Sequence, residues 1–160
     1  MTVPVNGDAA VIELLNEVLT AELTAVNQYF LDAKMFDNWG YDRLGHRFRD
    51  ESIGEMKDAD ELIERILYLD GHPNVQRLGN IQTGETAHEK FELALQLERA
   101  AIERLNRGIA LCVDRGDNGS RELLDDILKG EEDHADWLEV QLALIQHLGE
   151  NHYLAQQIHE

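Results

Sequence analysis

Apolar side chains recur at the spacing of an α-helix along four long stretches of the chain. The stripe is clearest in the first and third stretches, through Leu15, Val18, Val26 and Tyr29, and through Phe91, Leu95, Ala101 and Leu105. A stripe with this period is the core-facing side of an amphipathic helix. The pattern predicts helices over about 9–38, 42–70, 87–115 and 120–148, with one or two further turns within 151–159.

Residues that favour helix ends stand at the edges of these stretches. Asp8 is the expected N-cap of the first helix. Thr86 and Glu89 have the spacing of a capping box that opens the third helix. Gly71 and Gly149 are placed to stop the second and fourth helices.

The connections between the stretches set the topology. Trp39-Gly40 and residues 116–119 are short connections, so the first two helices and the last two are antiparallel neighbours. Residues 71–84 show no sustained period and can extend to about 46 Å, the length of a helix of about 30 residues. This segment can therefore leave the second and third helices parallel. The sequence predicts an all-α fold over residues 1–160, a single ferritin-like four-helix bundle with one long crossover and a short fifth C-terminal helix.

The composition bounds the class of protein. A hydrophobic fraction of 43% and a charged fraction of 29% in 160 residues describe a globular domain rather than a disordered chain. The net charge of −18 repels DNA and anionic lipid, so we expect no nucleic acid and no membrane as partners. An acidic surface favours cations, although the charge could serve only solubility. The N-terminus shows no signal peptide, and the single cysteine, Cys112, excludes internal disulfides, so we expect a cytoplasmic protein.

Acidic residues interrupt the apolar stripes at positions that should face the core: Glu22, Glu55, Glu98 and Glu131. Glu22 and Glu55 are 33 residues apart, as are Glu98 and Glu131, and each interval is centred on a predicted hairpin turn. Residues equidistant from such a turn lie at one level, so each pair should meet near mid-helix. Glu55 and Glu131 are each followed three residues later by a further potential ligand on the same helical face, Asp58 and His134.

This pattern predicts a metal centre with two ions. A buried carboxylate without a partner is costly, so several of them converging in a dry interior imply bound cations. Carboxylates with one imidazole suit iron or manganese, and the arrangement is that of di-iron carboxylate proteins, with Glu55 and Glu131 as the expected bridges. The alternative, that these acids lie on solvated faces, is disfavoured because Leu, Ile, Phe and Val flank them at core spacing.

Several longer segments resemble the bacterioferritin family over nearly the whole chain. They are ELTAVNQYF (22–30), MFDNWG (35–40), ESIGEM (51–56), RILYLDG (65–71) and EEDHADWLE (131–139). The resemblance implies a hollow homo-oligomeric shell of twenty-four subunits that oxidises Fe(II) with dioxygen or peroxide and stores a ferric mineral. It also implies haem b at a two-fold interface between paired subunits and a ferredoxin-type reductant for iron release.

Matched position by position, five residues correspond to the family's ferroxidase ligands: Glu22, Glu55, Glu98, Glu131 and His134. Asp58 departs from the pattern, since the family has His there. An Asp oxygen lies as many bonds from the backbone as the nearer imidazole nitrogen, so Asp58 could ligate in its place. Otherwise the site is weakened or holds a single metal ion.

Met56 matches the family's haem ligand. One position along the helix from Glu55, it is rotated about 100° from the core stripe and can face another subunit. Tyr29 could hydrogen-bond a metal ligand or donate an electron, or be an ordinary core residue. Asp50 and Gly54 stand where the family's inner-surface iron site has His and Asp, so that site is not expected here.

Two functions are compatible with these residues. The leading one is an iron-storage ferroxidase with a di-iron centre. The alternative, suggested by Asp58, is a haem-bearing shell subunit with an impaired di-iron site that co-assembles with a ferroxidase-competent second subunit type. A DNA-protecting mini-ferritin is disfavoured, because the chain has no basic tail.

Overall fold

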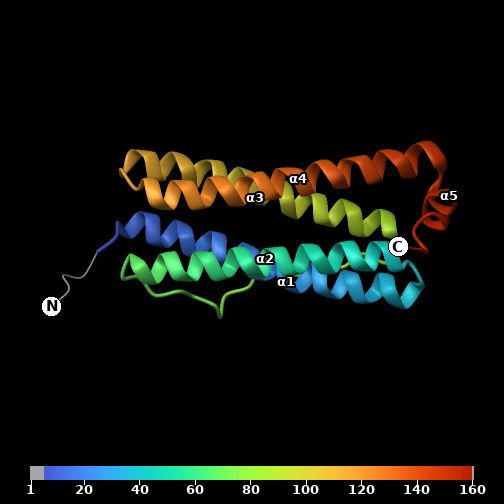
Figure 1. The fold of residues 1–160 in the computed structure, drawn as a ribbon, viewed down its shortest axis with the longest axis horizontal. Coiled ribbons are helices and arrows are strands. Elements are labelled where there is room, and N and C mark those ends of the chain that lie inside the picture. The colour runs from blue at the N-terminus through green and yellow to red at the C-terminus, as the bar shows by residue number, and fades with distance from the viewer. Residues whose placement is uncertain (1–5, 160) are drawn as a thin grey trace.

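The helices form a bundle of two antiparallel hairpins (Figure 1). Among residues 6–159, which the computed structural model describes, there are five helices: α1 (Ala9–Trp39), α2 (Asp42–Tyr68), α3 (Ala87–Asp114), α4 (Asn118–Leu148) and α5 (Glu150–Ala155). α1 packs mainly on α2, and α3 packs mainly on α4. α2 and α3 run in the same direction because the segment between them returns along the bundle (Figure 1). The predicted all-α bundle with one long crossover and a short fifth helix is confirmed.

Residues 1–5, on which the expected absence of a signal peptide partly rests, lie outside the described residues, as does Glu160. No helix within residues 6–159 has both the length and the apolar character needed to cross a membrane.

The predicted helix starts are formed by side-chain caps. Asp8 Oδ1 accepts from the backbone N–H groups of Ala10 (2.9 Å) and Val11 (3.2 Å) at the start of α1. Thr86 Oγ1 accepts from Glu89 N (3.1 Å) at the start of α3. The Glu89 carboxylate, however, accepts from Glu85 N (2.8 Å), one residue before the N-cap, so the capping box is shifted by one residue.

The second helix ends two residues earlier than predicted. Asp70 takes the left-handed conformation, with φ 63°, that we expected of Gly71. The Gly71 N–H then donates to Ile66 O at 2.9 Å, which closes the last turn after Tyr68. Asp tolerates this region better than most residues, which explains why the glycine was a misleading signal.

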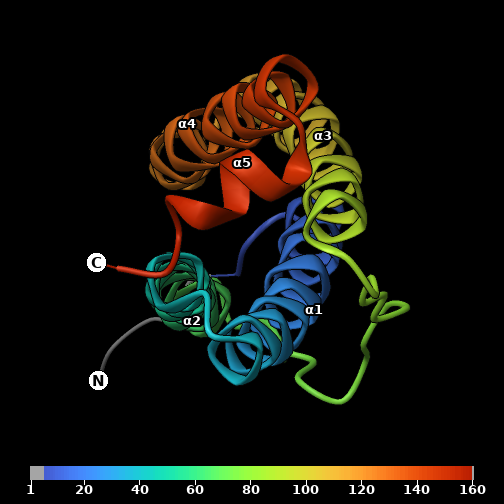
Figure 2. The same cartoon turned by 90° about the vertical axis from the view of Figure 1, so that its right-hand side faces the viewer.

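Polar side chains spaced four or eight residues apart along α1 hold the crossover against the bundle. The Asn16 side chain accepts from Asn74 N (2.8 Å), and Thr24 Oγ1 accepts from Gly79 N (2.8 Å). Farther along, Gln28 Oε1 accepts from Gln82 N (3.2 Å), and Asp32 Oδ1 accepts from Thr83 Oγ1 (3.0 Å). Figure 2 shows the crossover running outside α1 toward α3. One stripe of a single helix therefore fixes the longest irregular segment of the chain.

A buried lysine completes this anchoring. The Lys90 side chain is 0% exposed, and its Nζ donates to Asp32 Oδ1 at 2.9 Å and to Thr83 Oγ1 at 2.6 Å. The ammonium group also lies 5.2 Å from the centre of the Trp39 ring. This ion pair joins α1, α3 and the end of the crossover.

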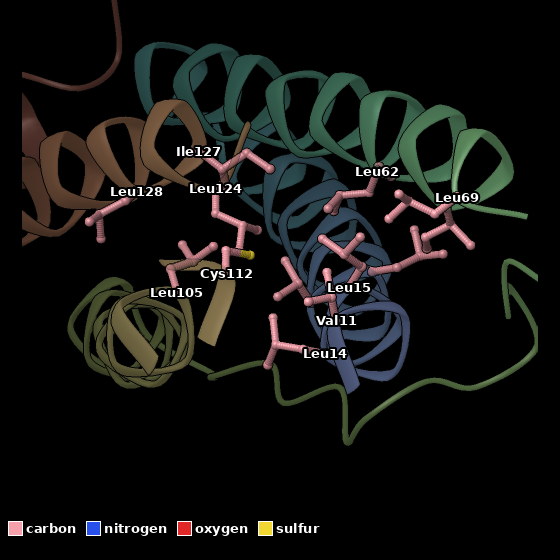
Figure 3. Close-up of a cluster of buried hydrophobic side chains, with 14 residues drawn as sticks. Val11, Leu14, Leu15, Leu62, Leu69, Leu105, Cys112, Leu124, Ile127 and Leu128 are labelled. Carbon is pink, nitrogen blue, oxygen red and sulfur yellow. The ribbon is translucent and has the colours of Figure 1, made fainter. Parts of the chain in front are cut away.

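Two apolar clusters fill the bundle, one on each side of its middle. The first joins the beginning of α1 and the end of α2 to the connected ends of α3 and α4, and includes Leu15, Leu62, Leu105, Cys112 and Leu124 (Figure 3). The second lies nearer α5 and is rich in aromatic rings, among them Tyr29, Phe36, Phe48, Phe91 and Tyr153. The level between the two clusters is where the predicted acidic residues lie.

Candidate metal centre

The acidic side chains on the core stripes meet halfway along the bundle. Each long helix contributes one glutamate, and the exposed fractions of Glu22, Glu55, Glu98 and Glu131 are 2%, 5%, 1% and 2%. Ligand oxygens of Glu22, Glu55, Asp58 and Glu131 lie within 4.8 Å of one another. Metal–oxygen distances of about 2.0–2.6 Å place opposite ligands up to about 5 Å apart, so these oxygens can share one cation.

A second group of potential ligands adjoins the first. Ligand atoms of Glu51, Glu55 and His134 also lie within 4.8 Å of one another. The buried His134 places its Nδ1 atom 2.9 Å from Glu98 Oε1 and 3.6 Å from Glu51 Oε2. Glu55 belongs to both groups, and the carboxyl group of Glu131 is hydrogen-bonded to those of Glu55 and Glu98. Glu55 is therefore the residue that both groups share, whereas Glu131 belongs to the first group only, and bridging by these two residues stays a prediction.

Glu51 is a potential ligand that the sequence analysis did not select. Its carboxylate is held by Arg47, with Nη2 to Oε1 at 2.9 Å, and the guanidinium group lies 4.2 Å from the centre of the Trp137 ring. The available signal was its position one turn before Glu55, which places both carboxylates on one helical face. That signal is weak alone, because carboxylates at this spacing are common on solvated helices.

Crowding and burial oppose ionisation of the glutamates. Burial raises the pKa of Glu22 well above its ordinary value, and the neighbouring Glu131 carboxylate raises it further. The pKa of Glu55 is raised in the same way by burial and then by Glu22, and that of Glu131 by burial and its contact with Glu98. Without cations, these carboxyl groups therefore hold protons at pH values where free glutamate has lost them.

The remaining ligands show the same effect of burial. Burial raises the pKa of Glu98 to about 7, although its hydrogen bonds with Glu131 and Tyr29 work in the opposite direction. Burial, together with Glu61 and Glu51, raises the pKa of Asp58 to about 7. Burial lowers the pKa of His134 to about 4, which keeps the imidazole neutral, the form that binds metal ions.

Three buried ligand atoms have no hydrogen-bond partner among the described residues: Glu22 Oε2, Glu98 Oε2 and His134 Nε2. Buried polar atoms in folded proteins are nearly always paired, so such a concentration in one layer indicates a missing ligand. The charge of the donor set, mostly carboxylate oxygens, indicates that this ligand is cationic.

Tyr29 lies directly against the centre. Its hydroxyl group donates a hydrogen bond to Glu98 Oε1, the same oxygen that faces His134 Nδ1. The Tyr29 ring meets the His134 ring edge-on, with centroids 5.2 Å apart. Tyr29 thus contacts two potential ligands and fixes their orientation.

The outer face of α1 and α2 carries the predicted haem-binding residue. Met56 is 49% exposed, and the apolar side chains of Ile53 on the same helix and Phe30 on α1 are 49% and 52% exposed.

Asp50 and Gly54 stand at the positions of the family's inner-surface iron site, which we do not expect in this chain. A Cβ atom on Gly54 would meet nothing within 4 Å. The Asp50 carboxylate is paired with His46 at 3.4 Å on the surface.

The fold and the cluster of potential metal ligands together define a ferritin-like protein. The sequence model of the Ferritin-like domain matches residues 12–148. The chain is 50% identical over 150 residues to bacterioferritins of Mycobacterium leprae and Mycobacterium tuberculosis, and the match covers 94% of each chain. It is 49% identical over 149 residues to a bacterioferritin of Streptomyces coelicolor, covering 93% of this chain and 89% of that protein.

The chain therefore belongs to the bacterioferritins, a family of iron-storage proteins.

Proposed function

We propose that the chain is a ferroxidase that oxidises Fe(II) at an intra-subunit di-iron site and stores Fe(III) as a mineral inside a shell of twenty-four copies. The proposed ligands are Glu22, Glu55, Asp58, Glu98, Glu131 and His134. One observation carries the proposal: two adjoining ligand groups share Glu55 at the level between the two apolar clusters of the bundle. Two cations held by a common carboxylate are the arrangement that this geometry supports best.

The charges support two divalent ions. Two ferrous ions bring four positive charges, which four ionised glutamates balance. In the absence of metal these carboxyl groups have raised pKa values, so binding Fe(II) displaces their protons. Asp58 adds a fifth carboxyl group that is only partly buried, so its remaining charge can be met by solvent.

The reaction requires little acid–base chemistry from the protein. Each Fe(II) ion gives up one electron, and one dioxygen molecule takes up two electrons and two protons to become hydrogen peroxide. The protein's part is to hold the ligands: Tyr29 orients Glu98, and Arg47 orients Glu51. The apolar clusters on either side lower the local dielectric and strengthen these contacts.

We further propose that Met56 ligates haem b together with the Met56 of a second copy across a two-fold axis. Its exposed thioether and the exposed apolar side chains of Ile53 and Phe30 on α2 and α1 fit a large apolar ligand better than they fit water. Haem bound there would supply a one-electron transfer centre, and Lys57, exposed next in the chain, could pair with a propionate.

The proposal extends to assembly and partners. Exposed apolar side chains on α2 and α4, including Leu67 (60%), Val140 (47%) and Leu148 (50%), are typical of surfaces that other subunits cover. The proposed partners are further copies of the chain and a ferredoxin-type reductant that releases the stored iron. We place the protein in the cytoplasm, without nucleic acid or membrane as a partner.

A second candidate function rests on Asp58. Glu22, Glu55, Glu98, Glu131 and His134 are all buried, whereas Asp58 is only partly buried and replaces the family's His. If its ligation is too weak to hold both ions, the chain is a haem-bearing shell subunit that needs a ferroxidase-competent partner subunit.

The test is the rate at which purified protein forms ferric species from Fe(II) in air. We expect the unaltered chain to exceed buffer alone, Glu55→Gln to lose most of the rate, and Glu64→Gln, an exposed carboxyl group on the same helix, to retain it. A rate equal to buffer alone refutes the proposal for this chain. A large gain in Asp58→His over a slow unaltered chain favours the second candidate instead.

A further inference from the structure

A cavity of about 220 Å³ lies between α1, α3 and the crossover, on one side of the metal centre. Glu22, Glu55, Glu98 and Glu131 form its inner end, where Glu22 Oε2 and Glu98 Oε2 lack partners among the described residues. The exposed residues Arg77 and Asn80 line its other end. The cavity therefore connects the surface to the proposed ligand oxygens.

The wall of this cavity is mostly small and apolar. Its apolar residues are Ala21, Ala25, Leu97, Ala100 and Ala101. Thr20 adds one buried hydroxyl group that has no hydrogen-bond partner within residues 6–159, and Thr24 Oγ1 already accepts from Gly79 N. A divalent cation takes about six oxygen ligands and gives up its bound water reluctantly. This wall has too few oxygen atoms to replace that water. A small apolar molecule meets no such cost.

The outer rim also disfavours cations. Apart from the four glutamates, the charged residues that line the cavity are Arg77, Arg104 and Glu17. The carboxylate of Glu17 is already paired with Arg107, 3.3 Å from its guanidinium group. The rim is therefore net positive, which repels Fe(II) but has no effect on an uncharged molecule.

On the α2 side of the metal centre, two acidic residues of the ligand groups are partly exposed to solvent. Arg47 pairs with Oε1 of Glu51, whereas Oε2 lies 3.6 Å from His134 Nδ1 and the side chain is 21% exposed. Asp58 is likewise only partly buried and has no arginine paired with it among the described residues. Both carboxylates are members of the ligand groups, so a cation passing them exchanges water for ligands step by step. The two substrates of an oxidation at this centre thus meet two chemically distinct surfaces.

We propose that dioxygen reaches the metal centre through the alanine-lined cavity, whereas Fe(II) reaches it past Glu51 and Asp58. The cavity is held open by the structure itself, because Thr24 and Gln28 fix the crossover that roofs it. The inference rests on the proposed function, since the centre needs an oxidant only if it oxidises Fe(II).

The test narrows the cavity and measures each substrate separately. In Ala101→Leu we expect oxidation of pre-bound Fe(II) by dioxygen to slow about tenfold, equivalent to about 1.4 kcal/mol in the barrier. The rate and affinity of anaerobic Co(II) binding, read from its d–d absorbance, should stay unchanged. Ala110→Leu, an exposed alanine on the same helix, is the matched control and should alter neither.

If Ala101→Leu slows Co(II) binding as much as it slows oxidation, the cavity is the route of the metal ion and the inference is wrong. If Ala101→Leu does not slow oxidation at all, the inference is also wrong. A second measurement, which does not depend on the folding of a variant, is to locate bound xenon in crystals of the unaltered protein under xenon pressure. Xenon bound beside Ala25 and Ala101 is expected, and its absence there contradicts the inference. Failure of the proposed function is distinguishable, because the unaltered chain would then oxidise no Fe(II).

Discussion

The buried carboxylates make the stability of the metal-free protein depend on pH, and Glu98 allows the effect to be isolated. Burial raises the pKa of Glu98 from 4.5 to about 7. Between these pH values the folded state binds a proton that the unfolded state has released. The stability due to this proton is complete below about pH 4.5 and is lost as the pH rises through 7. At 1.36 kcal/mol per pH unit, the loss is about 3 kcal/mol.

Glu98→Gln removes this titration while keeping an oxygen that can accept from Tyr29. When the pH is raised from about 4.5 to about 8, we expect the free energy of unfolding to fall by about 3 kcal/mol less in the variant than in the unaltered chain. The corresponding difference in the fall of Tm is about 6–12 °C. The lowered pKa of His134 acts in the opposite direction as the pH falls. Its causes are burial and the charges of Glu51 and Arg47, which the variant keeps, so most of this contribution cancels in the difference.

Chemical denaturation of the metal-free protein across this pH range measures the effect. Glu103→Gln, an exposed position on the same helix, is the control and should follow the unaltered chain. Saturating Co(II) at about pH 8 should restore the stability of the unaltered chain, because the cation replaces the protons. Parallel pH profiles for Glu98→Gln and the unaltered chain would show that Glu98 is not titrating in the folded interior, and would refute the reasoning.

Three further predictions concern other parts of the molecule. We expect Asp58→Ala to weaken binding of one of two Co(II) ions by about tenfold or more, whereas Asp58→His retains it, as measured by anaerobic titration. Met56→Leu should abolish the haem absorbance of protein loaded with haem and leave the rate of Fe(II) oxidation unchanged; retained absorbance would assign the haem elsewhere. Lys90→Met should cost about 3–5 kcal/mol in urea denaturation by leaving the Asp32 charge buried without its partner. Adding Asp32→Asn should recover much of that loss, and a double variant as unstable as Lys90→Met would contradict the electrostatic cause.

The helices could be predicted from the sequence because their signals are local. The period of the apolar stripes, the Asp8 cap and the turn at Gly149 act over a few residues, and the structure contains all of them. The misjudged end of α2 has a local cause as well, since both Asp70 and Gly71 can take the left-handed conformation. Asp70 takes it, while a Cβ atom on Gly71 would lie 2.7 Å from Ile12 Cγ2 and 3.0 Å from Ile66 Cγ2, a close approach that no local signal records.

The sequence by itself determined that four carboxylates face the interior at one level, because helical period and equal distance from a turn are properties of the chain alone. The tertiary structure decided the rest: the approach of Glu51 to His134, the membership of Glu55 in both ligand groups, and the cavity behind Glu22. These features depend on how helices from two separate hairpins are rotated and spaced. Shifts of about an ångström or two between packed helices decide these features, and the spacing of residues along the sequence does not record such shifts.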